Sequence, residues 1–154
     1  MKSRAVSADH LMRVSEKGIN DLSTSSTISV LLPGTSLCSF SNMYAPARKM
    51  LDQGCAIALA TDMSPNSWIE SMQLIVSLGC FMLRMTPAES LSAATINGAH
   101  AIGRSKKIGS IEIGKQCDLV LYNLSRYEQV PYMVSSGKVS KVIKKGRIVK
   151  ENQS

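Results

Sequence analysis

The sequence predicts an α/β fold, the C-terminal strand–helix units of a (β/α)8 TIM-like barrel, followed by a small β module. Up to Gly103, apolar strand-like runs alternate with helical segments, and strands joined by helices pair in parallel. After Gly103, short segments with glycine turns replace that pattern. A complete barrel takes about 250 residues, whereas this chain has 154. We therefore expect residues 1–103 and 104–154 to be two incomplete parts of a larger architecture.

The first part contains three candidate strands, each followed by a candidate helix. Residues 5–10 form a short strand that ends at Asp9-His10. Residues 27–34 and 55–62 are apolar and rich in β-branched residues, which is typical of strands buried on both faces. The first of these stops at Pro33-Gly34. Apolar spacing and glycine stops then predict helices within residues 11–22, 44–54 and 67–85.

The next helix has a clear start. Thr86 is a good N-cap, Pro87 suits the first helical position, and Glu89 completes a capping box. We expect this helix to break near Asn97-Gly98 and to restart through Ala101.

The second part reads as three or four short β-strands. Within residues 108–124, short strand-like segments are separated by glycine turns. Residues 140–151 are expected to form a hairpin around a Lys-Lys-Gly turn. The net charge of +7 gathers partly in this hairpin. No aromatic residues are interleaved there to stack on bases, so an exposed, charged strand edge is favoured over nucleic-acid binding.

Composition narrows the class of protein further. No apolar run reaches the ~20 residues that a membrane-spanning helix needs, and the start lacks a signal-peptide core. The four cysteines are irregularly spaced and form no CxxC pair. Reduced thiols in a cytoplasmic, globular protein are therefore the interpretation that fits best.

Two polar residues follow predicted strands, where a βα-barrel places its active site. They are His10 and Asp62, and the loop after Asp62 adds Ser64, Asn66 and Ser67. Imidazole and carboxylate groups suit a zinc or iron ion, and an aspartate beside a metal-bound water can accept its proton. Taken alone, Asp62 is equally well explained as a turn or capping residue, and His10 as a structural histidine.

At this point the residues resemble a known family. From Ser7 to Val149, the chain is similar to the C-terminal portion of the imidazolonepropionases, which belong to the metal-dependent amidohydrolase superfamily. Cys117 stands where alanine is commoner. The segments that carry the resemblance are SADHLMRVSEKGI, VLLPGTS, ARKMLDQGCAIALATDMSPNSW, MTPAESLSAATINGAHAIG and GSIEIGKQCDLVLYN.

The resemblance implies a distorted (β/α)8 barrel with a β-sandwich built from both chain ends. It implies hydrolysis of 4-imidazolone-5-propanoate to N-formimidoyl-L-glutamate in histidine degradation, with one zinc or iron ion. Asp62 then matches a metal ligand and proton acceptor, and His10 matches the group that polarises the substrate carbonyl. Ser64, Asn66 and Ser67 match positions that contact substrate or product, although some members carry Asn and Gly in place of Ser64 and Asn66.

The other metal ligands of the family, a His-x-His pair and a further histidine, have no counterpart here and are expected upstream of Met1. We therefore expect the 154-residue chain alone to be inactive and marginally stable. The expected partners are a small-molecule substrate and an N-terminal barrel half, if that half is encoded separately. A homodimer is compatible with the resemblance, and neither nucleic acid nor a membrane is expected.

Two alternatives stay open. One is a related amidohydrolase, such as a guanine-deaminase-like enzyme, which would share Asp62 and the β module. The other is a non-catalytic remnant or assembly subunit, which the absent ligands would explain. A substrate panel on the complete protein distinguishes an imidazolonepropionase from a related amidohydrolase. Metal analysis of the 154-residue chain tests whether it is a non-catalytic remnant.

Overall fold

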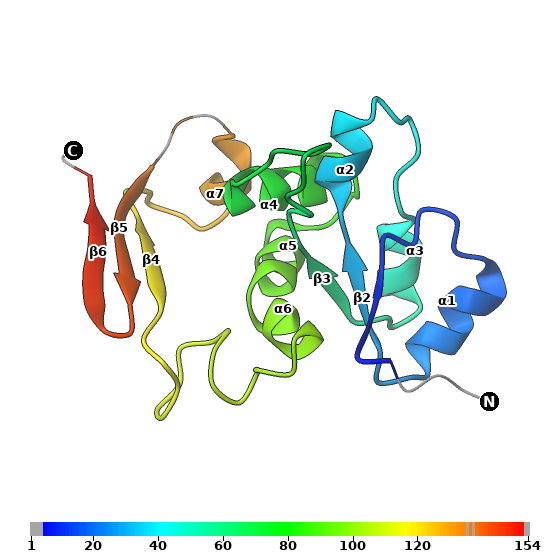
Figure 1. The fold of residues 1–154 in the computed structure, drawn as a ribbon, viewed down its shortest axis with the longest axis horizontal. Helices are drawn as coiled ribbons and strands as arrows, with labels where there is room; N and C mark the ends of the chain where they lie inside the picture. The colour runs from blue at the N-terminus through cyan, green and yellow to red at the C-terminus, as the bar shows by residue number, and fades with distance from the viewer. Residues whose placement is uncertain (1–4, 135, 137, 153–154) are drawn as a thin grey trace.

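A computed structural model describes residues 5–134, 136 and 138–152, and these form two three-stranded sheets (Figure 1). Residues 1–4 and 153–154, at the outer ends of the two predicted parts, lie outside the described residues. One sheet is parallel and the other is antiparallel. The parallel sheet contains β1 (Ser7–Asp9), β2 (Ile28–Leu31) and β3 (Ile57–Leu59), and the antiparallel sheet contains β4 (Leu119–Tyr122), β5 (Val139–Lys144) and β6 (Arg147–Glu151).

The parallel sheet confirms the predicted order of strands and helices. Strand β2 lies between β1 and β3, with Ser7 opposite Ile28 and Ser29 opposite Ile57. All three residues of β3 are buried, as expected for a strand covered on both faces. The connections carry α1 (Glu16–Ser23), α2 (Pro33–Cys38) and α3 (Ala47–Asp52).

Helix α2 was not predicted. Pro33-Gly34 was expected to stop the strand, and β2 does end at Leu31, but these residues also begin a helix of six residues. Proline favours the first position of a helix because that position needs no amide hydrogen bond and suits its fixed φ. The chain after β2 therefore turns back over the end of the sheet as a helix.

Three further helices cover the sheet. They are α4 (Met72–Phe81), α5 (Pro87–Ala94) and α6 (Ile96–Ala101). Helix α4 begins five residues later than predicted for Ser67–Met85, because Ser71 caps it. The capping box of α5 is confirmed. The break that follows falls at Thr95, earlier than Asn97-Gly98.

Asn97 has a role that its sequence context concealed. It lies inside α6, and its side-chain Nδ2 donates a hydrogen bond to the backbone carbonyl of Ile57 at 2.7 Å. The backbone amide of Ser29 in β2 donates to the carbonyl of Ala56, so that carbonyl faces β2. Successive carbonyls of a strand point to opposite sides, and the Ile57 carbonyl therefore points to the outer edge of β3. Helix α6 is thereby attached to the edge of the parallel sheet.

The hydrophobic core lies between the parallel sheet and its helices. Burial of these apolar side chains is the main stabilising term of this part. The most deeply buried large members are Ile19, Leu31, Met50, Ile57 and Ile75.

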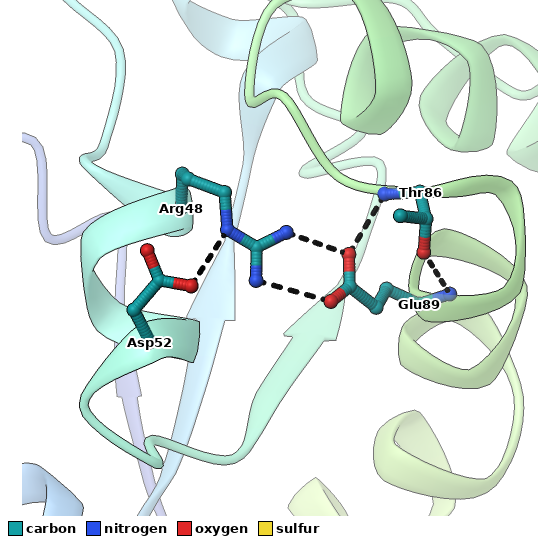
Figure 2. Close-up of polar contacts among 4 residues, drawn as sticks. All are labelled: Arg48, Asp52, Thr86 and Glu89. Atoms are coloured by element: carbon teal, nitrogen blue, oxygen red, sulfur yellow. Dashed lines mark hydrogen bonds and ion pairs between the residues drawn. The ribbon is translucent and has the colours of Figure 1, made fainter.

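A polar contact also joins α3 to α5 (Figure 2). The guanidinium of Arg48 donates from Nη1 and Nη2 to the two carboxylate oxygens of Glu89, at 3.0 and 3.1 Å. Its Nε donates to Asp52, and the backbone amide of Thr86 donates to Glu89. Hydrogen bonding from Arg48 is the main cause that lowers the pKa of Glu89 to about 2. A bidentate ion pair between two residues that lie 41 positions apart in the sequence thus joins α3 to α5.

The second part lies at the opposite end of the molecule from α1 and α3 in Figure 1. Helix α7 (Gln129–Tyr132) connects it to α4, because Gln73 Nε2 donates to the carbonyl of Met133 at 2.9 Å. The predicted hairpin is confirmed as β5 and β6, with Gly146 at φ 77° in the turn. Helix α7 was not predicted.

The segment before β4 corrects the expectation of several strands within residues 108–124. Only β4 forms there among the described residues. Residues 104–118 instead make turns, which Lys115 braces through hydrogen bonds to Ser110 and Glu112. Near β4, hydrogen bonding from Lys144 lowers the pKa of Asp118 to about 2.

Two negative findings hold for the described residues. None of their helices is both long and apolar enough to cross a bilayer. All four cysteines are free thiols, and burial raises the pKa of Cys55 and Cys80.

Candidate active site

His10 and Asp62 lie together at the carboxyl end of the parallel sheet. His10 directly follows β1, and Asp62 comes three residues after β3. The distance between His10 Nε2 and Asp62 Oδ2 is 3.8 Å, and the two side chains are 45% and 35% exposed. That spacing is too long for a direct hydrogen bond. The two groups are thus close, accessible and able to face a common ligand.

The backbone at both positions is unusual. His10 and Asp62 have φ values of 67° and 52°, and Leu11 has 56°. This left-handed region is uncommon for residues other than glycine, although Asn, Asp and His visit it more often. Such conformations cluster at functional sites, where the surrounding structure holds them. The two predicted residues thus share a conformational feature as well as a location.

A third polar residue, Thr35, was missed from the sequence. Its Oγ1 donates a hydrogen bond to Asp62 Oδ2 at 2.6 Å. Thr35 lies in α2, directly after β2, the strand between β1 and β3. The rule that selected His10 and Asp62, polar residues just after a strand, would have found it. The prediction that Pro33-Gly34 simply ended the strand hid that signal.

The loop after Asp62 forms a tight turn. Backbone hydrogen bonds run both ways between Ser64 and Ser67, at 3.1 and 3.0 Å, and place Asn66 at the exposed tip. Ser64 is partly buried. Ser67 is 1% exposed, and its hydroxyl has no hydrogen-bond partner in the structure. The loop lies beside Asp62, and the contacts of these three residues with substrate stay predictions.

The donor set near β1 and β3 fits one part of a metal site. Asp62 offers a carboxylate and His10 an imidazole, which zinc and iron accept. Within the described ranges, however, no group of three His, Cys, Asp or Glu side chains could hold an ion. These residues can therefore contribute to a metal centre but cannot build one without further ligands.

The other histidine stands apart from this site. His100 is exposed on α6 and lines an open depression of about 560 Å³ with Lys106, Glu112 and Lys115. None of the predicted site residues lines that depression. Its exposure is that of a surface residue.

Comparison with known sequences identifies the family. The model of the amidohydrolase family matches residues 6–149. The chain is 49% identical to the imidazolonepropionase of Geobacillus sp. (strain WCH70) and 44% identical to that of Parabacteroides distasonis, over 146 residues in each case. Each match covers 94% of this chain but only 34% and 35% of the relative. The chain thus spans about a third of the length of these relatives.

Solved structures agree on the fold. An adenosine deaminase from Xanthomonas campestris with bound zinc matches 92% of this chain and 36% of its own, with a TM-score of 0.82 and 26% identity. Escherichia coli guanine deaminase matches 96% of this chain and 39% of its own, with a TM-score of 0.76 and 19% identity. Sequence and structure therefore agree, and the chain belongs to the amidohydrolase family.

Proposed function

We propose that the chain is the C-terminal portion of an imidazolonepropionase, which hydrolyses the cyclic amide bond of 4-imidazolone-5-propanoate to give N-formimidoyl-L-glutamate. The main support for this proposal is that His10 and Asp62 lie together at the strand ends, with 3.8 Å between His10 Nε2 and Asp62 Oδ2. The identity of 44–49% with imidazolonepropionases supports this substrate over that of the deaminases, which are 19–26% identical. The complete protein is the enzyme, and the 154-residue chain alone is inactive.

Two side chains have distinct roles in this proposal. His10 donates a hydrogen bond to the ring carbonyl and stabilises the oxyanion that develops there. Asp62 accepts a proton from the attacking water and delivers it to the departing ring nitrogen. Water adds to the carbonyl carbon, the C–N bond breaks and the proton stays on nitrogen, so the atoms balance. Ser64, Asn66 and Ser67 contact the substrate or product from the loop.

Asp62 is also the ligand that this chain offers to one zinc or iron ion. When bound, such an ion lowers the pKa of a water and so supplies a nucleophile at neutral pH. Thr35 Oγ1 donates a hydrogen bond to Asp62 Oδ2 at 2.6 Å and so orients this carboxylate. The remaining ligands are expected outside this chain.

The same proposal extends to the architecture. Strands β1, β2 and β3 are the last three of a (β/α)8 barrel, and β4 to β6 belong to a composite β-sandwich, with the boundary at residues 103 and 104. The two edges of the parallel sheet, which pair with no further strand among the described residues, and the exposed residues of β6 support this placement. An N-terminal barrel half is the partner, and the complete enzyme acts in the cytoplasm, where a homodimer is compatible with it.

The test is a completed enzyme, in which this chain replaces the matching 146 residues of the Geobacillus relative. Purified protein with zinc or iron is assayed for loss of imidazolonepropanoate absorbance. We expect turnover that Asp62→Asn abolishes. If wild-type completed enzyme binds metal but leaves this substrate intact, the substrate assignment is wrong.

A deaminase is the second candidate, favoured by the TM-scores of 0.82 and 0.76 with adenosine and guanine deaminases. Guanine and adenosine therefore join the substrate panel, with release of ammonia as the readout. A non-catalytic remnant is the third candidate, and the absence of a three-ligand group in the described residues favours it. Stoichiometric metal and turnover in the completed enzyme would exclude the remnant.

A further inference from the structure

Thr35 makes the strongest polar contact of the candidate site. Its Oγ1 lies 2.6 Å from Asp62 Oδ2 and donates across 27 residues of sequence. A hydroxyl-to-carboxylate bond of this length is charge-assisted and is stronger than a neutral hydrogen bond. The contact joins α2, which follows β2, to the loop that follows β3. It therefore connects the ends of two neighbouring strands.

Close packing holds α2 against that loop. A Cβ added at Gly34 would lie 2.8 Å from Ile69 Cδ1 and 3.0 Å from Ile75 Cδ1. Both distances are tighter than ordinary side-chain contacts. Only the absence of a side chain at Gly34 lets the first turn of α2 approach so closely, and this approach brings Thr35 to Asp62.

The helix also holds the loop that follows β1. Ser36 is 2% exposed, and its hydroxyl donates to the sulfur of Met12 at 3.1 Å. Consecutive residues of α2 thus contact the segments that carry His10 and Asp62. The position of α2 is fixed from both sides, so the hydroxyl of Thr35 is presented to Asp62 in one orientation.

The bond distinguishes the two oxygens of Asp62. Oδ2 accepts from Thr35 and faces His10, whereas Oδ1 accepts no hydrogen bond within the described part of the chain. The backbone of Asp62 is in the left-handed region, with φ 52°, a conformation that the surrounding structure must hold. The hydroxyl of Thr35 is one contact of that surrounding structure.

We infer that Thr35 is a positioning residue, which fixes the Asp62 carboxylate through Oδ2 and leaves Oδ1 available to a metal ion or to the attacking water. The inference rests on the proposed role of Asp62. Within the described residues, the Thr35 hydroxyl donates only to Asp62, so it acts through that carboxylate. Hydrogen-bond partners of this kind typically contribute about 10–100-fold to metal affinity or activity when the ligand they orient is itself essential.

The test compares three variants of the completed enzyme. Thr35→Val keeps the shape and removes the hydroxyl, and Thr35→Ser restores the hydroxyl on a smaller side chain. Ser39→Ala is the matched control, since it removes an exposed hydroxyl that bonds only to the carbonyls of α2 itself. Zinc affinity of the metal-free protein is measured by competition with a chromophoric chelator, and kcat and KM are measured separately.

We expect Thr35→Val to weaken zinc affinity and to lower kcat by about 10–100-fold with KM little changed. Thr35→Ser should recover most of both losses, and Ser39→Ala should match wild type. Equal zinc affinity in wild type and Thr35→Val would overturn the inference, as would equal losses in Thr35→Val and Ser39→Ala. If wild type turns over no substrate, the proposed function fails, and the zinc titration still decides the role of Thr35.

Discussion

The parallel and antiparallel sheets differ in where their apolar side chains lie. In the parallel sheet β3 is wholly buried and β2 nearly so, and helices of the chain itself cover them. In the antiparallel sheet every residue of β6 is exposed, including Ile148 and Val149 at 56% and 62%. The first sheet therefore packs against a core within this chain, whereas the second leaves apolar side chains of β6 exposed.

The same difference separates chemistry from scaffold. His10 and Asp62 lie at the carboxyl end of the buried sheet, where the strands fix them. The charged groups of the second sheet, such as Asp118 with Lys144, pair with each other instead. The buried parallel sheet thus presents partly exposed polar groups at its end, whereas the charges of the second sheet pair with each other at a strand edge.

The largest expected effect concerns Asp62. In the completed enzyme, Asp62→Asn should lower kcat by about 10²–10⁴-fold, because the amide cannot accept the proton. Thermal stability should change little, since this partly exposed residue contributes chemistry more than packing. The exposed Asp52→Asn is the control for loss of a carboxylate. Retained activity in Asp62→Asn would assign the residue to turn formation alone.

Leu31→Ala tests the core of the first sheet. Leu31 is fully buried in β2, so the substitution should lower the free energy of unfolding by about 2–5 kcal/mol. Ile148→Ala in β6 should change it by less than about 0.5 kcal/mol in the 154-residue chain. Urea unfolding followed by circular dichroism measures both. Similar losses at the two positions would remove the distinction between the sheets.

Glu89→Gln tests the ion pair between α3 and α5. At pH 7 it should lower the free energy of unfolding by about 1–2 kcal/mol, because the pair with Arg48 loses its charge. The pKa of Glu89 is lowered to about 2 in the folded state. Its contribution is therefore complete above the ordinary glutamate pKa near 4.5 and is lost as pH falls toward 2. Wild type and variant should converge between pH 4.5 and 2, as urea titrations will show.

Asp118→Asn repeats the pH experiment in the second sheet. The pKa of Asp118 is also lowered to about 2, so its contribution has the same sign and is lost as pH falls below about 4. This carboxylate pairs with Lys144 at the exposed sheet, where salt screens the interaction. We expect its effect to shrink in 0.5 M NaCl more than that of Glu89. Equal salt sensitivity would argue against the contrast.

The smallest change in stability is expected for Ile148→Thr with Val149→Thr. Both side chains are exposed in the described structure, so unfolding of the 154-residue chain should barely change. Its self-association, measured by light scattering, should fall because an exposed apolar edge is removed. In the completed enzyme the same pair should cost more, if the rest of the protein covers this face.

Much of the first part could be predicted from residue patterns. Buried strands can be recognised from apolar, β-branched runs, and the start of α5 can be recognised from its N-cap residue, Thr86. Asp62 and His10 could be selected because strand order fixes which ends meet. Their 3.8 Å separation and left-handed backbone depend on tertiary packing, which periodicity does not contain.

Where the predictions from residue patterns were wrong, tertiary packing again decided the structure. Helix α2 was missed because Pro-Gly both stops strands and starts helices, and only packing against Ile69 and Ile75 decides between them. Residues 108–124 were predicted to contain several short strands, but residues 108–118 make turns, which the side-chain bonds from Lys115 to Ser110 and Glu112 brace. Thr35 was missed together with α2. Its contact with Asp62, which lies 27 residues away in the sequence, depends on the tertiary fold.

The bond from Asn97 to Ile57 has a consequence for how another strand could add to β3. The side-chain amide occupies the outward carbonyl of Ile57 and mimics the N–H of a neighbouring strand. An incoming strand could form hydrogen bonds freely at Leu59, but it would share the Ile57 carbonyl with Asn97, because a carbonyl oxygen has two lone pairs. Helix α6 thus makes pairing at Ile57 less favourable than at Leu59, and Asn97→Ala should remove this difference.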